Sequence, residues 1–330
     1  MLSKARILIT GATGFIGGRL LERLAVLNSD IRVVTSNFSN CARVSRYDVE
    51  IVKADLLDQK AMANVAKGCD VIFHCAYRFG GSSKEKHEAN VGGTSALASG
   101  ALKNGVRCFV HFSSVAAYGS WSDGAITEDR EPCRIEDTYS EVKLSIEQML
   151  LEVNRKHGLP VVILQPSIVY GPFGKTWTVD ILRQLRSQLV VLPREGSGIC
   201  NAVYVDDVVN AAIKSVDCAD AIGERFLLSG AESTTWKNFY NAYEQMLGGY
   251  APKPPDDADL KKIKHLGTFP HISDGRERFI PDETTLALYS SNAAVRIDKA
   301  RRYLGFEPAF DLIRGMALTR AWASWANLLN

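Results

Sequence analysis

A tyrosine and a lysine four residues apart are the pair best suited to moving a proton. Positions 139–143 read Tyr-Ser-Glu-Val-Lys, early in a stretch with a helical pattern. On a helix, positions i and i+4 share a face, so the ammonium of Lys143 can lie near the phenol of Tyr139. A nearby cation lowers a phenol pKa that starts near ~10, which makes Tyr139 usable as a general acid or base. The spacing also arises by chance, so a pair of surface side chains is the alternative.

A pair of serines stands where the substrate of such a tyrosine would lie. Ser113 and Ser114 follow one another at the end of a predicted strand. The carboxyl ends of parallel strands form the ligand crevice of a doubly wound sheet. A serine at this edge can therefore hydrogen-bond a substrate hydroxyl or carbonyl beside Tyr139.

The loop after the first predicted strand favours a phosphate group. It reads TGATGFIGG over 10–18 and leads into a predicted helix. Free N–H groups and the positive end of the helix dipole point at one spot there, and glycines let pyrophosphate oxygens approach the backbone. The spacing is G-x-x-G-x-x-G rather than G-x-G-x-x-G, so its position between strand and helix carries the prediction. A purely structural turn is the alternative.

The end of the second predicted strand bears on the choice of dinucleotide. An acid commonly stands there, where it binds the ribose 2′-hydroxyl and repels a 2′-phosphate. Here the turn holds Ser36 and Asn37 instead, and Arg43 follows a few residues on. We therefore expect NADP at least as readily as NAD. Asp55, after the third predicted strand, could accept a hydrogen bond from the adenine amino group or could cap a helix.

The elements that position these groups alternate along the first half of the chain. Short apolar runs predict strands at 6–10, 31–35, 49–53, 71–75, 109–113 and 161–165, and helical patterns lie at 15–27, 59–66, 85–104 and 138–156. Strands alternating with helices, and apolar on both faces, predict a parallel sheet covered on both sides. The predicted class is α/β: a Rossmann-type doubly wound parallel sheet with a smaller C-terminal substrate domain.

The second half of the chain is less regular. A strand then a helix are predicted over 202–216, a strand at 226–229, helices at 236–247, 298–304 and 312–329, and a loop over 249–283. We expect residues 1–166 to form the dinucleotide-binding domain, to which a strand–helix unit near 200–230 returns. Residues 167–330 would mostly bind the substrate.

Composition narrows the class of protein. The chain has 330 residues, of which 46% are hydrophobic and 23% charged, and its net charge is +2. These values are typical of globular chains, and the charge gives no support to a nucleic-acid partner. No apolar stretch reaches the ~18 residues of a membrane span, and the start is not a signal peptide. Seven cysteines without a C-x-x-C suggest reduced thiols and a cytoplasmic protein. No metal site is expected.

These pieces together resemble the extended short-chain dehydrogenase/reductases, the NAD-dependent epimerase/dehydratase family. The matching segments occur in family order and cover nearly the whole chain: TGATGFIGG at 10–18, ADLLD at 54–58, HCAY at 74–77, EANVGGT at 88–94, FSSVAAYG at 112–119, YSEVK at 139–143, QPSIVYGP at 165–172, VYVDDVV at 203–209 and DKARRYLGFEP at 298–308. The set is far more specific than any one of its members.

The resemblance implies roles for individual residues. Tyr139 would be the acid/base, Lys143 its pKa-lowering partner and a ribose ligand, and Ser114 the group that polarises the reacting oxygen. Ser114 rather than Ser113 is implied because it stands four residues before Tyr118, as in the family's S-x-x-x-Y-G. The predicted cofactor-binding residues are Gly11, Thr13, Gly14, Phe15, Ile16, Gly17, Ser36, Asn37, Arg43, Asp55, Leu56, Cys75, Ala76, Tyr77, Asn90, Tyr139, Lys143, Pro166 and Val169.

Two residues within the segments that match the family pattern can also be interpreted as structural. Asn90 matches the family's helix asparagine, and a plain N-cap or surface asparagine is its alternative. The family's V-x-V-x-D matches residues 203–207, and Asp206 within this segment is interpreted as structural.

Departures from the family pattern narrow the chemistry. Sugar 4,6-dehydratases of this family resemble S-T-D-E-V-Y-G, whose acid pair adds and removes water. Val115 and Ala116 hold those two places here, so dehydration is not expected. The decarboxylases' glutamate and the cysteine of the 3,5-epimerase/reductase type are missing from this loop as well. Hydride transfer at one carbon remains, either as 4-epimerisation or as reduction of a ketone.

The substrate pocket is less clearly indicated. Nucleotide-sugar epimerases usually carry Arg-Asp where this chain has Asn201-Ala202, and Asn201 resembles the reductases and hydroxysteroid dehydrogenases of the wider group. Arg276 or Arg278 could still bind a pyrophosphate, or could be solvated loop charges. The predicted substrate-binding residues are Ser114, Phe173, Lys175 and Asn201, with Trp177 beside them; Trp121 and Trp236 could stack on a base, although the hydrophobic core is favoured.

Three functions remain after this reading. The leading one is an NAD(P)-dependent epimerase or ketoreductase acting on a nucleotide-activated sugar, in a chain expected to form a homodimer. The second is an NADPH-dependent reductase of a free, less polar ketone, such as a flavonoid-like or steroid-like carbonyl. The third is a catalytically silent dinucleotide-binding regulator, which has no need of an intact Ser114, Tyr139 and Lys143.

Overall fold

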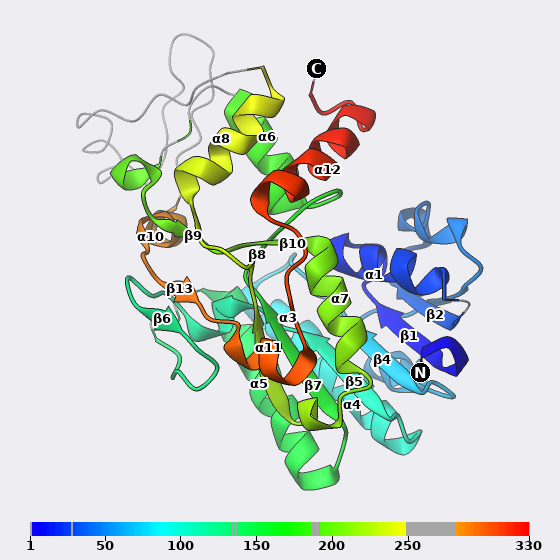
Figure 1. Ribbon diagram of the computed structural model, residues 1–330. Helices are drawn as coiled ribbons and strands as arrows, with labels where there is room; N and C mark the ends of the chain where they lie inside the picture. Colours follow the sequence, from blue (N-terminus) through cyan, green and yellow to red (C-terminus); the bar gives the residue numbers. More distant parts are fainter. Residues whose placement is uncertain are drawn as a thin grey trace.

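A seven-stranded parallel sheet forms the centre of the molecule, in the order β11-β7-β5-β4-β1-β2-β3 (Figure 1). The computed structural model describes residues 2–27, 29–133, 135, 137–186, 190, 192–248 and 282–329. The strands are β1 (Arg6–Thr10), β2 (Asp30–Thr35), β3 (Glu50–Lys53), β4 (Val71–His74), β5 (Cys108–Phe112), β7 (Val161–Pro166) and β11 (Glu224–Leu228). The predicted doubly wound α/β fold is confirmed.

Strand order creates a crevice at the carboxyl end of β1. This strand pairs with β2 on one side and with β4 on the other, so the chain reverses its direction of winding there. Ligands of open α/β sheets bind at such switch points. The glycine loop over 10–18 leaves β1 at this place.

Helices cover both faces of the sheet because its strands are apolar on both sides. On one face, α1 (Phe15–Ala25) and α7 (Val205–Ser215) pack on a core that includes Ile7, Ile9 and Leu20. On the other, α2 (Gln59–Asn64), α4 (Gly93–Lys103) and α5 (Thr138–His157) pack on a core that includes Leu8 and Ile72.

The long helix α5, which carries the predicted acid/base, has clear start and stop signals. The side chain of Asp137 caps its first turn by accepting a hydrogen bond from the Ser140 N–H at 2.9 Å. Gly158, in the left-handed conformation with φ 74°, ends it. An aspartate N-cap and a glycine after the last turn are strongly preferred at these places. The first turn of α5 is therefore held in a fixed position beside the crevice.

The helix predicted over 85–104 is broken into three parts. It consists of α3 (Ser83–His87), a π-helical turn (Glu88–Gly92) and α4. Gly93 begins α4 where a side chain would have no room, because a Cβ there would lie 2.5 Å from the Leu56 carbonyl oxygen. The broken helix places Asn90 under the loop that follows β4.

Most of the remaining elements gather beyond the carboxyl edge of the sheet, whereas α11 (Asp298–Leu304) lies against β11 and α7 (Figure 1). The remaining elements include three two-stranded sheets, in which β8 pairs with β10, β9 with β12 and β6 with β13. The elements are β6 (Ala125–Ile126), β8 (Ile168–Tyr170), α6 (Asp180–Arg186), β9 (Ile199–Cys200), β10 (Ala202–Tyr204), β12 (Thr234–Thr235), α8 (Trp236–Met246), α10 (Glu283–Ser290), β13 (Ala294–Val295), α11 (Asp298–Leu304) and α12 (Leu312–Trp325).

Aromatic side chains fill the interior of this second region. Trp236 and Tyr240 of α8 and Tyr289 of α10 are fully or almost fully buried, and the Trp236 and Tyr289 ring centroids lie 4.4 Å apart. The core interpretation of Trp236 therefore agrees with the structure. Trp121 is only partly buried, and it lines the main cavity.

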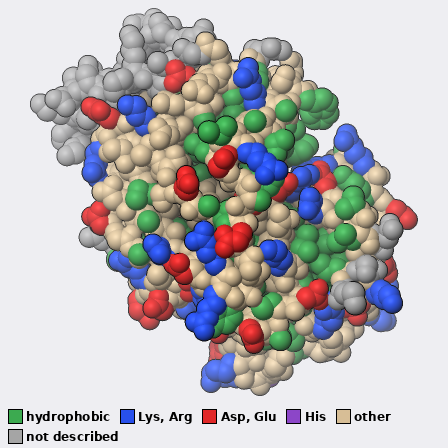
Figure 2. Space-filling view, in the orientation of Figure 1, with side chains coloured by type: hydrophobic (Ala, Val, Ile, Leu, Met, Phe, Trp, Pro, Cys, Tyr) green, Lys and Arg blue, Asp and Glu red, His purple; other side chains and the backbone are tan. Residues whose placement is uncertain are grey.

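A partly buried ion pair joins α1 to α7 on the same face of the sheet. Arg19 of α1 donates two hydrogen bonds to the Asp206 carboxylate of α7, at 2.6 and 2.7 Å. Such a planar, two-bond pairing fixes geometry as well as charge. Asp206 thus has a structural role, as the sequence analysis expected, because it holds α7 against α1. Elsewhere on the face seen in Figure 2, charged side chains of both signs are interspersed.

Candidate active site

One large cavity joins the glycine loop to the predicted proton-transfer residues. Its volume is about 1730 Å³, and it runs along the carboxyl edge of the sheet into the C-terminal region. Of the predicted site residues it is lined by Gly11, Thr13, Gly14, Phe15, Ile16, Gly17, Ser36, Arg43, Asp55, Leu56, Cys75, Ala76, Tyr77, Ser114, Tyr139, Lys143, Pro166, Val169, Phe173, Lys175 and Asn201.

The three glycines of the G-x-x-G-x-x-G motif differ in what surrounds them. Gly11 has φ +71°, and a Cβ there would lie 2.7 Å from the Ala76 backbone nitrogen. A Cβ on Gly17 would overlap the Gly11 carbonyl. A Cβ on Gly14 would contact only the Gly11 carbonyl oxygen, at 3.2 Å, and Gly14 lines the cavity. Gly11 and Gly17 therefore allow close packing of the protein, whereas Gly14 leaves space for a ligand.

The residues present fit a dinucleotide. Gly14 is the N-cap of α1 and supplies no side-chain hydrogen bond, so the first turn keeps N–H groups available to an anion. Thr13, Ser36 and Asp55 continue the lining from the loop toward the ends of β2 and β3. This is the arrangement that a pyrophosphate, a ribose and an adenine require in this order.

Two predicted cofactor residues are not where the prediction put them. The side-chain oxygen of Asn37 accepts hydrogen bonds from the N–H and hydroxyl of Ser39, at 3.0 and 2.7 Å, and Asn37 does not line the cavity. Asn90 is 1% exposed and likewise lies outside the lining. Its amide accepts from the Arg78 N–H at 2.7 Å and donates to the Arg78 carbonyl at 3.1 Å. Asn90 is thus buried and supports the loop after β4, which excludes the surface interpretation, and its part in cofactor binding stays a prediction.

Arg43 lines the cavity but is already engaged. Its guanidinium contacts the Glu22 carboxylate at 2.6 and 2.8 Å and lies 3.8 Å from the centre of the Phe173 ring. The sequence could not show this pairing, because Glu22 belongs to α1 and Phe173 to a segment far along the chain. A 2′-phosphate would have to compete with both contacts.

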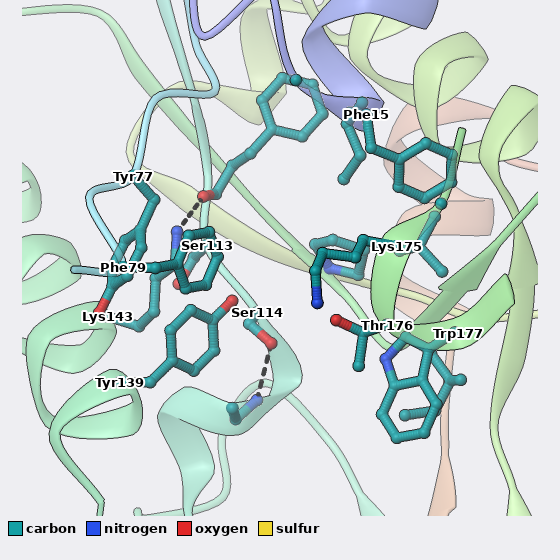
Figure 3. A pocket seen from close by; sticks show the side chains of 18 of the residues that line it. Phe15, Tyr77, Phe79, Ser113, Ser114, Tyr139, Lys143, Lys175, Thr176 and Trp177 are labelled. Atoms are coloured by element: carbon teal, nitrogen blue, oxygen red, sulfur yellow. Dashed lines mark hydrogen bonds between the residues drawn. The ribbon is translucent and has the colours of Figure 1, made fainter. Parts of the chain in front are cut away.

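The three predicted catalytic residues meet at the middle of the cavity. In Figure 3 the Tyr139 hydroxyl points toward Ser114, and Lys143 lies behind the tyrosine ring. The Nζ of Lys143 donates to the Phe112 carbonyl at 2.7 Å and lies 5.7 Å from the centre of the Tyr139 ring. The Oγ of Ser114 accepts from the Ala116 N–H at 3.1 Å, which fixes the orientation of its side chain.

Electrostatics at Tyr139 differ from the sequence-based expectation. Burial raises the pKa of the phenol above its usual value, a hydrogen bond with Ser114 lowers it, and the charge of Asp137 raises it. The expected lowering of this pKa by Lys143 is therefore not seen in this arrangement. Burial instead lowers the pKa of Lys143 to about 8, although the nearby charge of Glu147 raises it.

A buried carboxylate behind the site was missed by the sequence analysis. Glu147, one turn after Lys143 and fully buried, accepts hydrogen bonds from the Ser113 hydroxyl and from the Gln165 amide at 2.9 and 3.0 Å. Ser113 is thus held away from a substrate by Glu147, which supports the choice of Ser114. The helical spacing of Glu147 from Lys143 could have shown that they share a face.

The C-terminal region lines the far part of the cavity. Lys175 forms an ion pair with Asp180 at 2.8 Å, and Asn201 uses its amide to bind the backbone of Ala293 and Val295, both at 2.9 Å. Arg276 and Arg278 lie outside the described residues. Lining residues that the sequence analysis did not assign include Arg78, Phe79, Thr176, Gln184, Thr285 and Leu288.

Comparison with known proteins identifies the family. Residues 7–228 match the NAD dependent epimerase/dehydratase family, and the chain belongs to it. The uncharacterized protein y4nG of Sinorhizobium fredii is 30% identical over 211 residues, which cover 62% of this chain and 52% of that protein. The dTDP-glucose 4,6-dehydratase of Streptomyces griseus is 28% identical and covers 96% of this chain and 93% of its own. The 3beta-hydroxysteroid-dehydrogenase/decarboxylase isoform 1 of Arabidopsis thaliana is 24% identical, and the match covers 94% of this chain and 78% of that protein.

Solved structures share the fold across the whole chain. The UDP-glucose 4-epimerase of Thermotoga maritima, solved with UDP-glucose, has a TM-score of 0.75 at 23% identity and covers 98% of this chain and 99% of its own. The UDP-glucuronic acid 4-epimerase of Bacillus cereus, solved with NAD, has a TM-score of 0.79 at 21% identity and covers 98% and 100%. Within the described part of the chain, no helix has both the length and the apolar character needed to cross a membrane.

Proposed function

We propose that this protein is an NAD(P)-dependent oxidoreductase or epimerase that transfers a hydride at one carbon of its substrate, with Tyr139 as the acid/base. The observation that carries the proposal is the convergence of Ser114, Tyr139 and Lys143 on the same cavity as the uncapped glycine loop. A silent dinucleotide-binding regulator has no need of this convergence.

Each residue has a defined task in the proposed reaction. The Tyr139 hydroxyl gives a proton to the substrate oxygen during reduction and takes it back during oxidation. Ser114 hydrogen-bonds the same oxygen and holds it beside the phenol. The Lys143 ammonium stabilises negative charge on Tyr139 after the proton has left. A nicotinamide ring, when bound, supplies or accepts the hydride.

The two residues after Ser114 support a reaction other than dehydration. Val115 and Ala116 line the cavity next to the serine, where a dehydratase needs an acid and a base. A reaction that adds or removes water has no acid–base pair at these two positions. Epimerisation or simple reduction moves one proton, which Tyr139 can transfer, and one hydride, which a bound nicotinamide would carry, so we propose one of these two.

A nucleotide-activated sugar is the substrate class that the relatives favour. The UDP-glucose and UDP-glucuronic acid epimerases share the fold, and a dTDP-glucose enzyme is among the relatives. The second candidate is a free, less polar ketone. It is favoured by the cavity wall near Tyr139, where Phe79, Val115, Ala116 and Trp121 present apolar surface, and by the hydroxysteroid dehydrogenase relative.

Mass spectrometry of the protein as purified, under native conditions, tests this function. An epimerase must return the hydride to the same substrate, so retained NAD supports epimerisation. A reductase exchanges its cofactor in every turnover, so an empty site that takes up added NADPH supports reduction. A protein that neither retains nor binds a nicotinamide dinucleotide would contradict the proposal in both forms.

A further inference from the structure

The loop after β4 carries an aromatic side chain that no task yet explains. Phe79 is 72% exposed and lines the cavity beside the predicted acid/base. Its ring is nearly parallel to that of Tyr139, at 11° and 6.1 Å between centroids, and 4.7 Å from the ring of Tyr77. In Figure 3 the Phe79 ring lies above that of Tyr139, and Ser114 lies beside the tyrosine.

The backbone around Phe79 is held in place from both sides. On one side, the buried amide of Asn90 binds both the N–H and the carbonyl of Arg78, the preceding residue. On the other, Gly81 turns the chain with φ +103° into a capping box, in which Ser82 and Glu85 bind each other's backbone N–H groups. Phe79 therefore has a fixed place, and its exposure follows from a defined loop conformation.

Exposed aromatic surface at a fixed place in a cavity favours an apolar partner. Removing such surface from water is favourable in proportion to its area. The neighbouring wall is also apolar, since Val115, Ala116 and Trp121 follow Ser114 in the lining. Among the described lining residues of the C-terminal region, the charged side chains are Lys175 and Asp180, and these two are paired. The wall beside Phe79 thus offers apolar contact to a ring system, while neutral polar side chains such as Ser120, Thr176 and Thr285 line other parts of the cavity.

We propose that Phe79 determines substrate specificity by packing against an apolar ring system that carries the reacting carbonyl or carbinol carbon. The substrate class is then a free alicyclic ketone or the corresponding secondary alcohol. This inference rests on the proposed hydride transfer at Tyr139 and decides between its two substrate classes. The Phe79 ring is stacked on that of Tyr139, and the ring system of the substrate packs against the exposed surface of Phe79 while Tyr139 and Ser114 bind its oxygen.

The test uses the full chain saturated with NADP⁺ and two probes, 2-decalone and UDP-glucose, titrated by calorimetry. We expect 2-decalone to bind more tightly than UDP-glucose. Phe79→Ala weakens 2-decalone binding by about tenfold or more, which corresponds to roughly 1.4 kcal/mol. Phe79→Leu keeps the apolar surface and stays within about threefold of the wild type. Trp325→Ala, which removes a side chain of 71% exposure outside the cavity lining, changes nothing.

Several results would overturn the inference. Failure of 2-decalone to bind, tighter binding of UDP-glucose, or an unchanged 2-decalone affinity in Phe79→Ala each contradicts it. Reduction of 2-decalone by Tyr139→Phe, measured separately with NADPH as the hydride donor, separates this inference from the proposed function. If Tyr139→Phe remains active, the proposed function fails whatever Phe79 does. If Tyr139→Phe is inactive and Phe79→Ala binds normally, only the role of Phe79 fails.

Discussion

The two halves of the cavity are built in different ways. The cofactor half is formed by the loops that follow β1, β2, β3 and β4, and much of its surface is backbone at Gly11, Gly14 and Gly17. The substrate half is formed by side chains from segments near 115, 173, 200 and 288, which the fold brings together. A phosphate is bound by N–H groups that every sequence has, whereas a substrate is bound by the side chains of one sequence. The first half therefore indicates a family and the second a specificity.

The largest effect is expected at Tyr139, which lies where the two halves of the cavity meet. Tyr139→Phe removes the hydroxyl without altering the glycine loop, so turnover should fall while dinucleotide binding persists. Loss of a general acid–base typically costs 10²–10⁴-fold in rate, or about 3–5 kcal/mol of barrier. Stopped-flow turnover and a dinucleotide titration on the same preparation measure both properties. Near-wild-type turnover in the variant would refute the assignment of Tyr139.

A side chain on Gly14 tests the cofactor half alone. Gly14→Val should weaken dinucleotide binding more than about tenfold, or ~1.4 kcal/mol, because its Cβ enters the space left for the ligand. A cooperative thermal melt is expected, since the strands are untouched and Gly14 has φ −90°, which other residues adopt. Fluorescence titration and the melt check both points.

The choice of a fallback variant follows from the same geometry. Gly14→Ala is the suitable smaller change if Gly14→Val does not fold. Gly11→Ala is unsuitable, because its Cβ would collide with the Ala76 backbone and test packing instead of binding. Unchanged dinucleotide affinity in folded Gly14→Val would show that the loop is only a turn.

The same contrast explains which features the sequence could predict. β1 and α11 have the predicted limits, and the other central strands are within one or two residues of them, because strands buried on both faces appear as unbroken apolar runs. The short strands β6, β9, β12 and β13 have two residues each, too few for any periodic pattern. Glycine spacing and the Tyr139–Lys143 spacing are local, so they could be found in the sequence.

Contacts between distant segments could not be found in this way. Arg43 is paired with Glu22 and packed on Phe173, and Asn90 supports Arg78, through contacts that only the folded chain creates. The role of Phe79 also depends on such contacts, since its sequence neighbours are two glycines and an arginine. Sequence motifs therefore indicated the family better than the substrate.

Two arginines in the cofactor half could distinguish NADP from NAD. We expect NADP(H) to bind at least as tightly as NAD(H), because no acid stands at Ser36 to repel a 2′-phosphate. Arg78 lines the same cavity, lies 3.9 Å from Asp55, and its buried Nε has no hydrogen-bond partner among the described residues. A charge-assisted hydrogen bond contributes about 1.5–3 kcal/mol, or roughly 10–100-fold.

Titrating both dinucleotides into two variants distinguishes the arginines. Arg78→Ala should weaken NADP binding by about tenfold, and Arg43→Ala by less, because the Arg43 guanidinium is already bound to Glu22. An equal loss for NAD and NADP in Arg78→Ala would assign Arg78 to the pyrophosphate rather than the 2′-phosphate. A strong preference of the wild type for NAD would show that the turn after β2 has been misinterpreted.

The smallest expected effect is a shift in the pH profile caused by Lys143. Its pKa is lowered to about 8, chiefly by burial, so the ammonium that supports Tyr139 is lost as the pH rises through that value. kcat/KM should therefore fall above pH ~8. Lys143→Arg keeps its charge to higher pH, so the fall in kcat/KM (the alkaline limb of the pH profile) should move to higher pH. Glu147→Gln removes a charge that raises the Lys143 pKa, and should move the limb downward.

Stability should change in the opposite direction over the same pH range. Between about 8 and the unfolded value of 10.5, the unfolded chain binds more protons at this lysine than the folded chain. Its contribution to the free energy of unfolding therefore rises with pH there. A fall in kcat/KM above pH ~8 without a drop in melting temperature would separate titration of the site from unfolding. If the alkaline limb lies at the same pH in Lys143→Arg, in Glu147→Gln and in the wild type, it reports the titration of another group. The Tyr139 phenol would be the next group to test.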